Sequence, residues 1–398
     1  MSEQLPKYRW VILGLTFTAN IWLCFAWRSI SPLLSSIKEY FLLTNLQVSL
    51  LLSVLSSTLV FTLLGGILAD KFGVRKVNTL GLALMGISSL FRGFAPTFEA
   101  LLLTQALFGL GMALSISNFP KLLRVWFTNK EFGLASGVNM LGVGGGSALA
   151  VGLTAVYALS FLGSWQQVLI IYSIPLLVIV PLWWLFVRES PLPDHHFHAS
   201  SVPVTKGLRH VVKIKQMFPL ACVRMVNGAA QFSFTLLLPL LLQSQGLTLI
   251  EAGLITSTVE IFSAIGNFLL PVISDRAGKR KPFITLACLA YLLAATFLAL
   301  GIPQMLWIGA IIFGFFAGGQ ATILLMIPLE LPEIGGMYGG TALGLLASIG
   351  SFTGIFTSII IGYIMDVYQS FTIVLGFLAL IALISLIAIF QLKESFRK

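Results

Sequence analysis

The sequence predicts an all-α membrane protein with twelve transmembrane helices in two pseudo-symmetric six-helix bundles. The chain of 398 residues is 57% hydrophobic and only 10% charged, and its mean hydropathy is +0.97. An ordinary soluble domain is roughly half apolar and about a quarter charged. Apolar stretches of spanning length recur along the whole chain, and a polar stretch divides them midway. Because lipid offers no hydrogen-bond partners to open strands, we expect these stretches to be helices.

Each apolar stretch is long enough to cross a bilayer once. A helix needs about 20 residues to span a hydrocarbon core roughly 30 Å thick. Twelve candidate spans follow one another, approximately at residues 10–37, 46–69, 77–95, 99–121, 133–158, 166–187, 217–241, 250–273, 282–301, 305–328, 338–363 and 371–391. The even number predicts that both termini lie on the same side of the membrane.

Residues 188–216 are the longest polar stretch and contain three prolines and all four histidines of the chain. We interpret this segment as a linker between an N-terminal bundle at 1–187 and a C-terminal bundle at 217–398. The run DHHFH at 194–198 has metal-capable side chains, but in a solvated loop it predicts no metal site. The three cysteines lie in predicted spans without metal-ligand spacing, so we expect neither a disulfide nor a zinc site.

The net charge of +10 reflects membrane topology. Most of the 24 Lys and Arg residues lie at the termini or in alternate loops, the loops that follow the second, fourth, sixth and eighth spans. The positive-inside rule then places both termini in the cytoplasm. We therefore expect a multi-pass, monomeric protein of the cell membrane (inner or plasma), with the lipid bilayer as its surroundings and no nucleic-acid partner.

The two halves look like a repeat. Asp70 and Asp275 each lie at the end of the second span of a half and are 205 residues apart. Pro120 and Pro328, near the ends of the fourth spans, are 208 residues apart. Parallel repeats about an axis along the membrane normal are one common transporter plan.

Two charged loop motifs point to a family. The stretches GGILADKFGVRK, at 65–76, and SDRAGKRK, at 274–281, resemble the cytoplasmic loop motif of the major facilitator superfamily. That motif reads Gly-x-x-x-Asp-Arg/Lys-x-Gly-x-Arg-Lys/Arg, and the resemblance extends to the spans, the two halves and the central loop. It implies the major facilitator fold and a secondary transporter that works by alternating access around one site between the halves.

The resemblance also implies gating roles for four residues of the two motifs. Asp70 and Asp275 would latch one half to the other on the cytoplasmic side, since a carboxylate can accept from the exposed N–H groups of a helix terminus. The basic residues can pair with acidic groups or lipid headgroups. Gly73 and Gly278 are expected to form tight turns. The full predicted gating set is Asp70, Arg75, Asp275 and Arg280.

The chain departs from the family at two places. Its fourth span has Gln105, four residues ahead of Gly109, where the family usually carries an arginine. Its fifth span has three consecutive glycines but lacks the Gly-Pro pair of the drug antiporters. Both departures argue against multidrug efflux. For the glycines we expect helix packing first and ligand contact second.

Charged residues inside spans are costly and are therefore functional candidates. Arg28 lies 10 residues before Lys38, and Glu260 lies 9 residues after Glu251, so both are near the midplane, about 13–15 Å from the outer surface. Arg28 has the planar, permanent charge that suits a carboxylate, and its alternative is a structural pair with Glu260 or a backbone carbonyl. Glu260 is a candidate proton site, a cation ligand or that structural partner.

Other polar residues within the spans could line the same cavity. Arg92 lies close to the end of its span, and we expect it to be an interfacial anchor. Further candidate ligands of the substrate are Arg224, Asn20, Asn118, Asn227 and Gln231.

The favoured function is transport of a small organic anion, in first place a carboxylate, coupled to protons by symport or antiport, or exchanged. The alternatives are transport of a zwitterion or cation recognised by Glu260, and a non-transporting membrane sensor. Phosphate-binding loops of nucleotide-driven pumps are absent from the sequence, and none of the predicted spans contains histidine. We therefore expect neither an enzyme nor a bound cofactor, and nitrate is disfavoured because the second span has no arginine.

Overall fold

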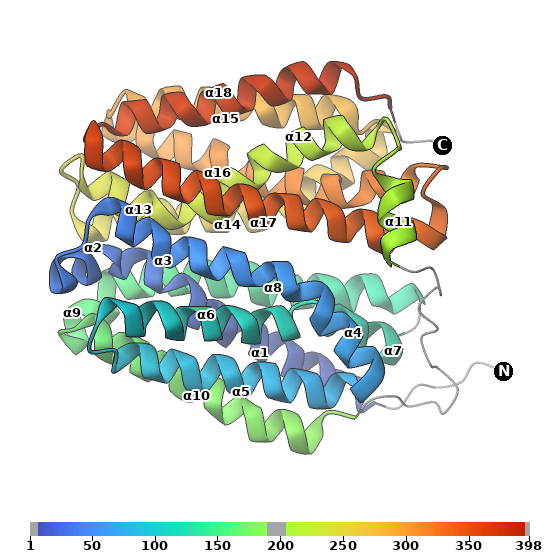
Figure 1. Cartoon of the computed structure of the whole chain (residues 1–398), viewed down its shortest axis with the longest axis horizontal. Coiled ribbons are helices and arrows are strands. Elements are labelled where there is room, and N and C mark those ends of the chain that lie inside the picture. Colours follow the sequence, from blue (N-terminus) through green and yellow to red (C-terminus); the bar gives the residue numbers. More distant parts are fainter. Residues whose placement is uncertain (1–6, 128, 189–203, 395–398) are drawn as a thin grey trace. The chain divides into compact units, whose positions relative to one another are not determined.

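The computed structural model describes residues 7–127, 129–188 and 204–394, and in these ranges all regular structure is helical. The chain forms two compact units (Figure 1). The first unit holds residues 1–42 and 54–198, and the second holds residues 43–53 and 199–398. The division into bundles at 1–187 and 217–398 stays a prediction.

The first unit contains the helices of the N-terminal half. In chain order they are α1 (Arg9–Arg28), α2 (Ile30–Phe41), α3 (Asn45–Thr58, which continues from the second unit), η1 (Leu59–Phe61), α4 (Thr62–Phe72), α5 (Val74–Gly93), α6 (Phe98–Ser115), α7 (Asn118–Trp126), α8 (Asn129–Leu153), η2 (Thr154–Ala158), α9 (Leu159–Leu162) and α10 (Trp165–Phe186). Here η1 is a 3₁₀ turn and η2 a π-helical turn.

The second unit contains the helices of the C-terminal half. They are α11 (Val204–Val211), α12 (Met217–Gly228), the π-helical turn η3 (Ala229–Phe234), α13 (Thr235–Gln243), α14 (Leu249–Ala277), α15 (Lys281–Ala299), α16 (Pro303–Glu330), α17 (Gly335–Val367) and α18 (Phe371–Phe390).

Most predicted spans are single long helices. Within the described residues, nine helices are long and apolar enough to cross a membrane, and the bent pair 217–231 and 235–243 could be a tenth, with a bend of 47°. The other two predicted spans are also helical: one is α5, and the other is α3 to α4 with the η1 turn between them. The protein is therefore an all-α, multi-pass membrane protein.

The predicted linker is only partly a loop. Its last part contains α11, which packs against α17, and His210 of α11 stacks on Tyr338 with ring centroids 4.3 Å apart. The polar composition of this segment predicted a loop. The short helix α11 forms there because it is amphipathic and packs against an aromatic partner. The run at 194–198 lies outside the described residues.

Close helix contacts hold the first unit together. In this unit α5 packs along both α6 and α10, and α1 packs along α8 (Figure 1). A β-carbon at Gly146 of α8 would lie 2.9 Å from the α-carbon of Ile21 in α1, too close for any larger residue. The expected packing role of the glycine-rich fifth span is confirmed at this position.

Small residues serve the same purpose in the second unit, where α14 packs along α16. Gly314 and Gly318 are spaced by four residues on α16, and β-carbons there would collide with the carbonyl oxygens of Val259 and Ser263. This spacing lets two helices approach closely. These two close contacts, at Val259 and Ser263, hold α14 on both sides of Glu260.

The start of α3 is capped by a carboxylate from far along the chain. Both oxygens of Asp366, near the end of α17, accept from the backbone N–H groups of Asn45 (2.7 Å) and Leu46 (2.9 Å). Thr44 and Gln47 complete the cap, since each side chain accepts from the other's backbone N–H. The four N–H groups that a helix start leaves unsatisfied are thus all bonded.

Removing this carboxylate should loosen the start of α3. A lost N-terminal cap typically costs about 1 kcal/mol, or roughly a fivefold change in a local opening equilibrium. We therefore expect Asp366→Ala to speed amide hydrogen exchange at residues 45–48 about fivefold, measured by mass spectrometry. The matched control is Glu39→Ala, which removes an exposed carboxylate six residues before α3. Unchanged exchange in Asp366→Ala would show that the cap adds no stability.

Candidate functional site

Arg28 occupies the middle of the first span. It is the last residue of α1, and α1 and α2 follow one another across Ser29 as one span, 33 residues long. Its side chain is 5% exposed, and its guanidinium lies over the ring of Trp27 at 4.2 Å from the centroid. Cation–π contact of this kind orients a guanidinium without neutralising its charge. Arg28 therefore lies near the middle of its helical span, and its depth in the membrane stays a prediction.

Arg92 is buried inside the first unit, and the prediction of an interfacial anchor is wrong. Its side chain is 0% exposed and donates to Gln105 Oε1, to the carbonyl oxygen of Ala26 and to Ser89 Oγ, each at 2.9 Å. The ring of Phe108 lies 4.2 Å from the guanidinium. Arg92 thus joins three helices, α1, α5 and α6. Hydrogen-bond partners on these helices hold the guanidinium inside the unit, where it does not reach the surface.

Two predicted ligands in the first unit take part in bonds between helices. Asn20 of α1 donates to Asn139 Oδ1 of α8 at 2.9 Å. Asn118, 0% exposed, donates to the carbonyl oxygens of Leu114 (2.7 Å) and Gly65 (3.2 Å). These bonds give both side chains a structural role, whatever else they contact.

In the second unit, Glu260 lies within α14 and is 6% exposed. The neighbouring residue Val259 is pressed against Gly314 of α16, so this turn of α14 has little freedom to move. A carboxyl group held at mid-span on a rigid helix is costly to keep in a membrane and is typical of a functional position.

A chain of hydrogen bonds crosses the second unit beside these helices. Arg224 of α12 donates to Asn227 Oδ1 at 2.6 Å and to the carbonyl oxygen of Leu346 at 3.2 Å. Asn227 donates to the carbonyl oxygen of Ala317 and lies 3.4 Å from the hydroxyl of Tyr291, which donates to Gln320. This network connects α12, α15, α16 and α17.

The predicted ligand Gln231 lies in η3, the π-helical turn after α12, and is half-buried. π-Helical turns inside membrane helices often mark functional sites, because they leave the regular bonding ladder. The structure therefore keeps Gln231 among the candidates.

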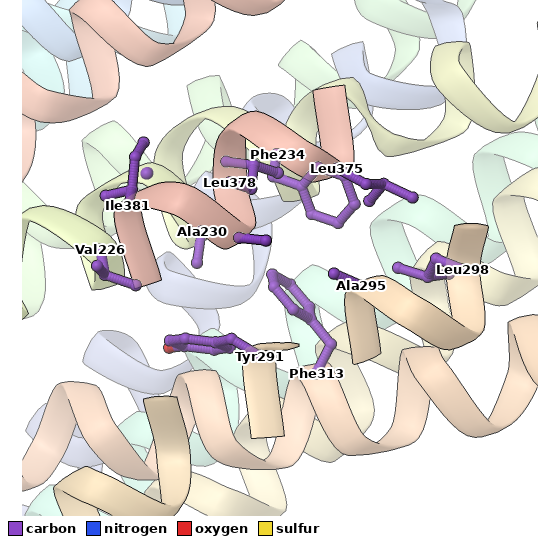
Figure 2. Close-up of a pocket in the computed structure, with 12 residues that line it drawn as sticks. Val226, Ala230, Phe234, Tyr291, Ala295, Leu298, Phe313, Leu375, Leu378 and Ile381 are labelled. Carbon is purple, nitrogen blue, oxygen red and sulfur yellow. The ribbon is translucent and has the colours of Figure 1, made fainter. Parts of the chain in front are cut away.

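An apolar cavity lies beside η3, between α12, α15, α16 and α18 (Figure 2). Phe234, Tyr291 and Phe313 form its aromatic wall. Its volume of about 30 Å³ is room for about two water molecules, not for an organic substrate. In this structure the cavity is therefore a packing feature.

The first loop motif folds as a tight turn. Gly73 joins α4 to α5 with φ 93°, as its glycine predicts. Arg75 donates to the carbonyl oxygen of Trp184 in α10 and lies over its ring at 4.6 Å. This partner differs from the expected acidic group or headgroup, because a helix C-terminus offers free carbonyl oxygens. The side chain of Asp70 lies outside the described part of the structure.

The second loop motif forms an ion-pair cluster inside the second unit. Arg280, whose side chain is 2% exposed, pairs with Asp275 at 2.6 Å and with Glu330 of α16 at 2.7 Å. Burial alone would lower the pKa of Arg280, but its bonds to Glu330 and Asp275 more than offset this and raise the pKa above its ordinary value. Gly278 has φ 65° and makes the turn, as predicted. The cluster ties the loop after α14 to the end of α16.

The residues that the structure describes contain no group of three or more His, Cys, Asp or Glu side chains that could hold a metal ion. Within the same residues the three cysteines are free thiols.

Sequence comparison decides the family. The sequence profile of the Major Facilitator Superfamily matches residues 16–341. The chain belongs to this superfamily. The fold agrees, since the crystal structure of the nucleoside transporter NupG superposes with a TM-score of 0.81 at 18% identity, over 97% of this chain and 100% of that one.

Two relatives whose names state a substrate are transporters of organic acids. A probable sulfoacetate transporter of Cupriavidus necator is 24% identical over 92% of this chain and 89% of its own length. A probable galactarate/D-glucarate transporter of Escherichia coli is 24% identical over 81% of this chain and 80% of its own length. The superfamily and these relatives are transporters and not enzymes.

Sequence reasoning missed the contact between Arg92 and Gln105. Arg92 lies two residues before the turn at 94–97 and Gln105 lies eight residues after it, so their positions in the hairpin do not match and gave no signal. The long side chain of Arg92 spans this difference and reaches Gln105 Oε1 at 2.9 Å. The cation that the family usually carries on the fourth span is here on the third, bonded to the glutamine that replaces it.

Proposed function

We propose that the chain is a secondary active transporter that moves a small organic anion, in first place a carboxylate, by alternating access. The observation that carries the proposal is Arg28, a guanidinium buried at mid-span in a member of a transporter superfamily. A planar fork of donors suits a carboxylate in two-pronged geometry. Relatives whose names give organic acids as substrates support the same class.

In this proposal Arg28 binds the anion. Glu260 carries a coupling proton. Arg224 and Gln231 are additional candidate ligands from the second unit. Asn20, Asn118 and Asn227 already bond to other groups, so a substrate would have to share their bonds. Asp70, Arg75, Asp275 and Arg280 are proposed to act in gating.

The proposal includes a position in the cell. The protein would be a monomer in the cell membrane. Both of its termini would lie in the cytoplasm, since basic residues concentrate at the termini and in alternate loops, and such residues favour the cytoplasmic side. Protease added outside intact cells should then leave tags at both termini uncut, and cleavage would reverse the orientation.

The test is a thermal-shift panel on the purified protein. The panel contains sulfoacetate, D-glucarate, D-gluconate and other organic acids, with amino acids as zwitterions and organic amines as cations. A ligand that binds only the folded state stabilises it by about 2.7 kcal/mol at a hundred times its dissociation constant. We expect stabilisation by organic acids only. Stabilisation by cations or zwitterions alone would contradict the anion proposal and indicate recognition by Glu260.

A further inference from the structure

Arg92 is a buried positive charge with only neutral partners. In the part of the chain that the structure describes, its contacts are the side chains of Gln105 and Ser89, the carbonyl oxygen of Ala26 and the ring of Phe108. Hydrogen bonds to neutral groups engage both terminal nitrogens of the guanidinium but leave its charge uncompensated. A membrane protein that retains such a costly group at 0% exposure is expected to use it.

The contact with Ala26 connects this charge to Arg28. Ala26 precedes the end of α1 by two residues, and the guanidinium of Arg28 lies over Trp27, the residue between them. The bond from Arg92 to the carbonyl oxygen of Ala26, at 2.9 Å, therefore holds the helical turn that carries Arg28. Arg92 is fixed in turn by Gln105 and Ser89, so the turn is anchored to α5 and α6.

We propose that Arg92 is a positioning residue of the anion site and supplies it with a second positive charge, so that the site favours dianions over monoanions. The inference rests on the proposed function of Arg28. Arg92 does not touch the substrate in this account. It holds the Arg28 turn and raises the electrostatic potential around it, where the low dielectric of the protein interior transmits the effect.

Coulomb's law gives this role a signature that a structural role lacks. As a general scale, two unit charges about 12 Å apart at an effective dielectric constant of about 20 interact by about 1.4 kcal/mol, which changes an equilibrium constant about tenfold. The effect on the free energy is proportional to the ligand's charge, so the fold-change for a dianion is about the square of that for a monoanion. D-Glucarate and D-gluconate are a suitable pair, since they differ by one carboxylate on the same carbon skeleton.

The experiment measures the dissociation constants of both sugar acids, and of sulfoacetate, for the wild type and three variants. Arg92→Gln removes the charge and keeps a hydrogen-bonding side chain. Arg92→Gln combined with Gln105→Arg returns the charge across the same contact. Ser89→Ala is the matched control, because it removes one bond of Arg92 and keeps its charge.

For Arg92→Gln we expect about tenfold weaker binding of D-gluconate and about a hundredfold weaker binding of D-glucarate. The exchanged double variant should recover most of the preference for the dianion, and Ser89→Ala should retain it. Equal losses for the two sugar acids, or no loss, would overturn the inference. Should Arg92→Gln fail to fold, Arg92→Lys decides, since it must keep the ratio of the two affinities even where both weaken.

The failure of the proposed function looks different. If the wild-type protein binds none of these anions, the proposed function and the inference fall together. If the wild type binds these anions but the ratio of its affinities for D-glucarate and D-gluconate does not depend on Arg92, the inference falls and the proposed function stands.

Discussion

Replacing Arg28 by alanine is expected to abolish binding of the transported anion and leave a folded protein. The guanidinium is the permanent charge at mid-span of α1, and without it a carboxylate would lose its charged donor in a medium where water cannot replace it. Arg28→Lys keeps the charge but loses the two-pronged geometry. We expect it to weaken binding about 10- to 100-fold, since a hydrogen bond to a charged group is worth about 1.5–3 kcal/mol. Calorimetric titration of the purified variants with D-glucarate measures both effects.

Lys38→Ala is the matched control for Arg28, because it removes a cation from the end of the same span and should leave affinity unchanged. Wild-type affinity in Arg28→Ala would refute the assignment. A structural pairing of Arg28 with Glu260 predicts another pattern, in which each single variant loses thermal stability and the double variant regains much of it. A double variant that regains stability and still binds the anion would overturn the site.

Loss of Arg280 is expected to give the largest effect on stability. Removing one partner of a buried ion pair costs about 3–5 kcal/mol. The carboxylates of Asp275 and Glu330 are 46% and 23% exposed and can regain water, which lowers our expectation for Arg280→Met to about 2 kcal/mol. Thermal unfolding of the purified variant measures the loss.

Lys279→Met provides the comparison, since Lys279 is an exposed cation in the same loop and its loss should cost little. Adding Glu330→Gln to Arg280→Met should recover part of the stability. The second substitution removes one of the two carboxylates that lost Arg280, so Asp275 no longer lies near a second negative charge. If Arg280→Met and Lys279→Met unfold at the same temperature, the cluster adds no stability.

Local patterns in the sequence predicted local structure well. Gly73 and Gly278 were expected at tight turns from the motif alone, and both have positive φ. The spans were predicted from their length, because a helix needs about 20 residues to cross a bilayer. The place of Arg28 near the middle of its helical span followed from counting residues along a helix.

Contacts between helices were harder to predict. A span that is apolar on all sides has no sequence signal for the face that meets protein and the face that meets lipid. Arg92 was therefore assigned to the interface from its place near the end of α5, although it lies inside. Asp366 and Asn45 are 321 residues apart, and neither has a local pattern that indicates the cap. Such pairs follow from packing and not from periodicity.

The most direct test of the account is counterflow in proteoliposomes. Vesicles with the purified protein are loaded with D-glucarate or sulfoacetate and diluted into a trace of the same labelled acid, with and without a pH gradient. We predict transient accumulation of label by the wild type, none by Arg28→Ala, and net uptake driven by the gradient if protons are coupled. Folded wild-type protein that moves none of the organic acids of the panel under either condition would contradict the account.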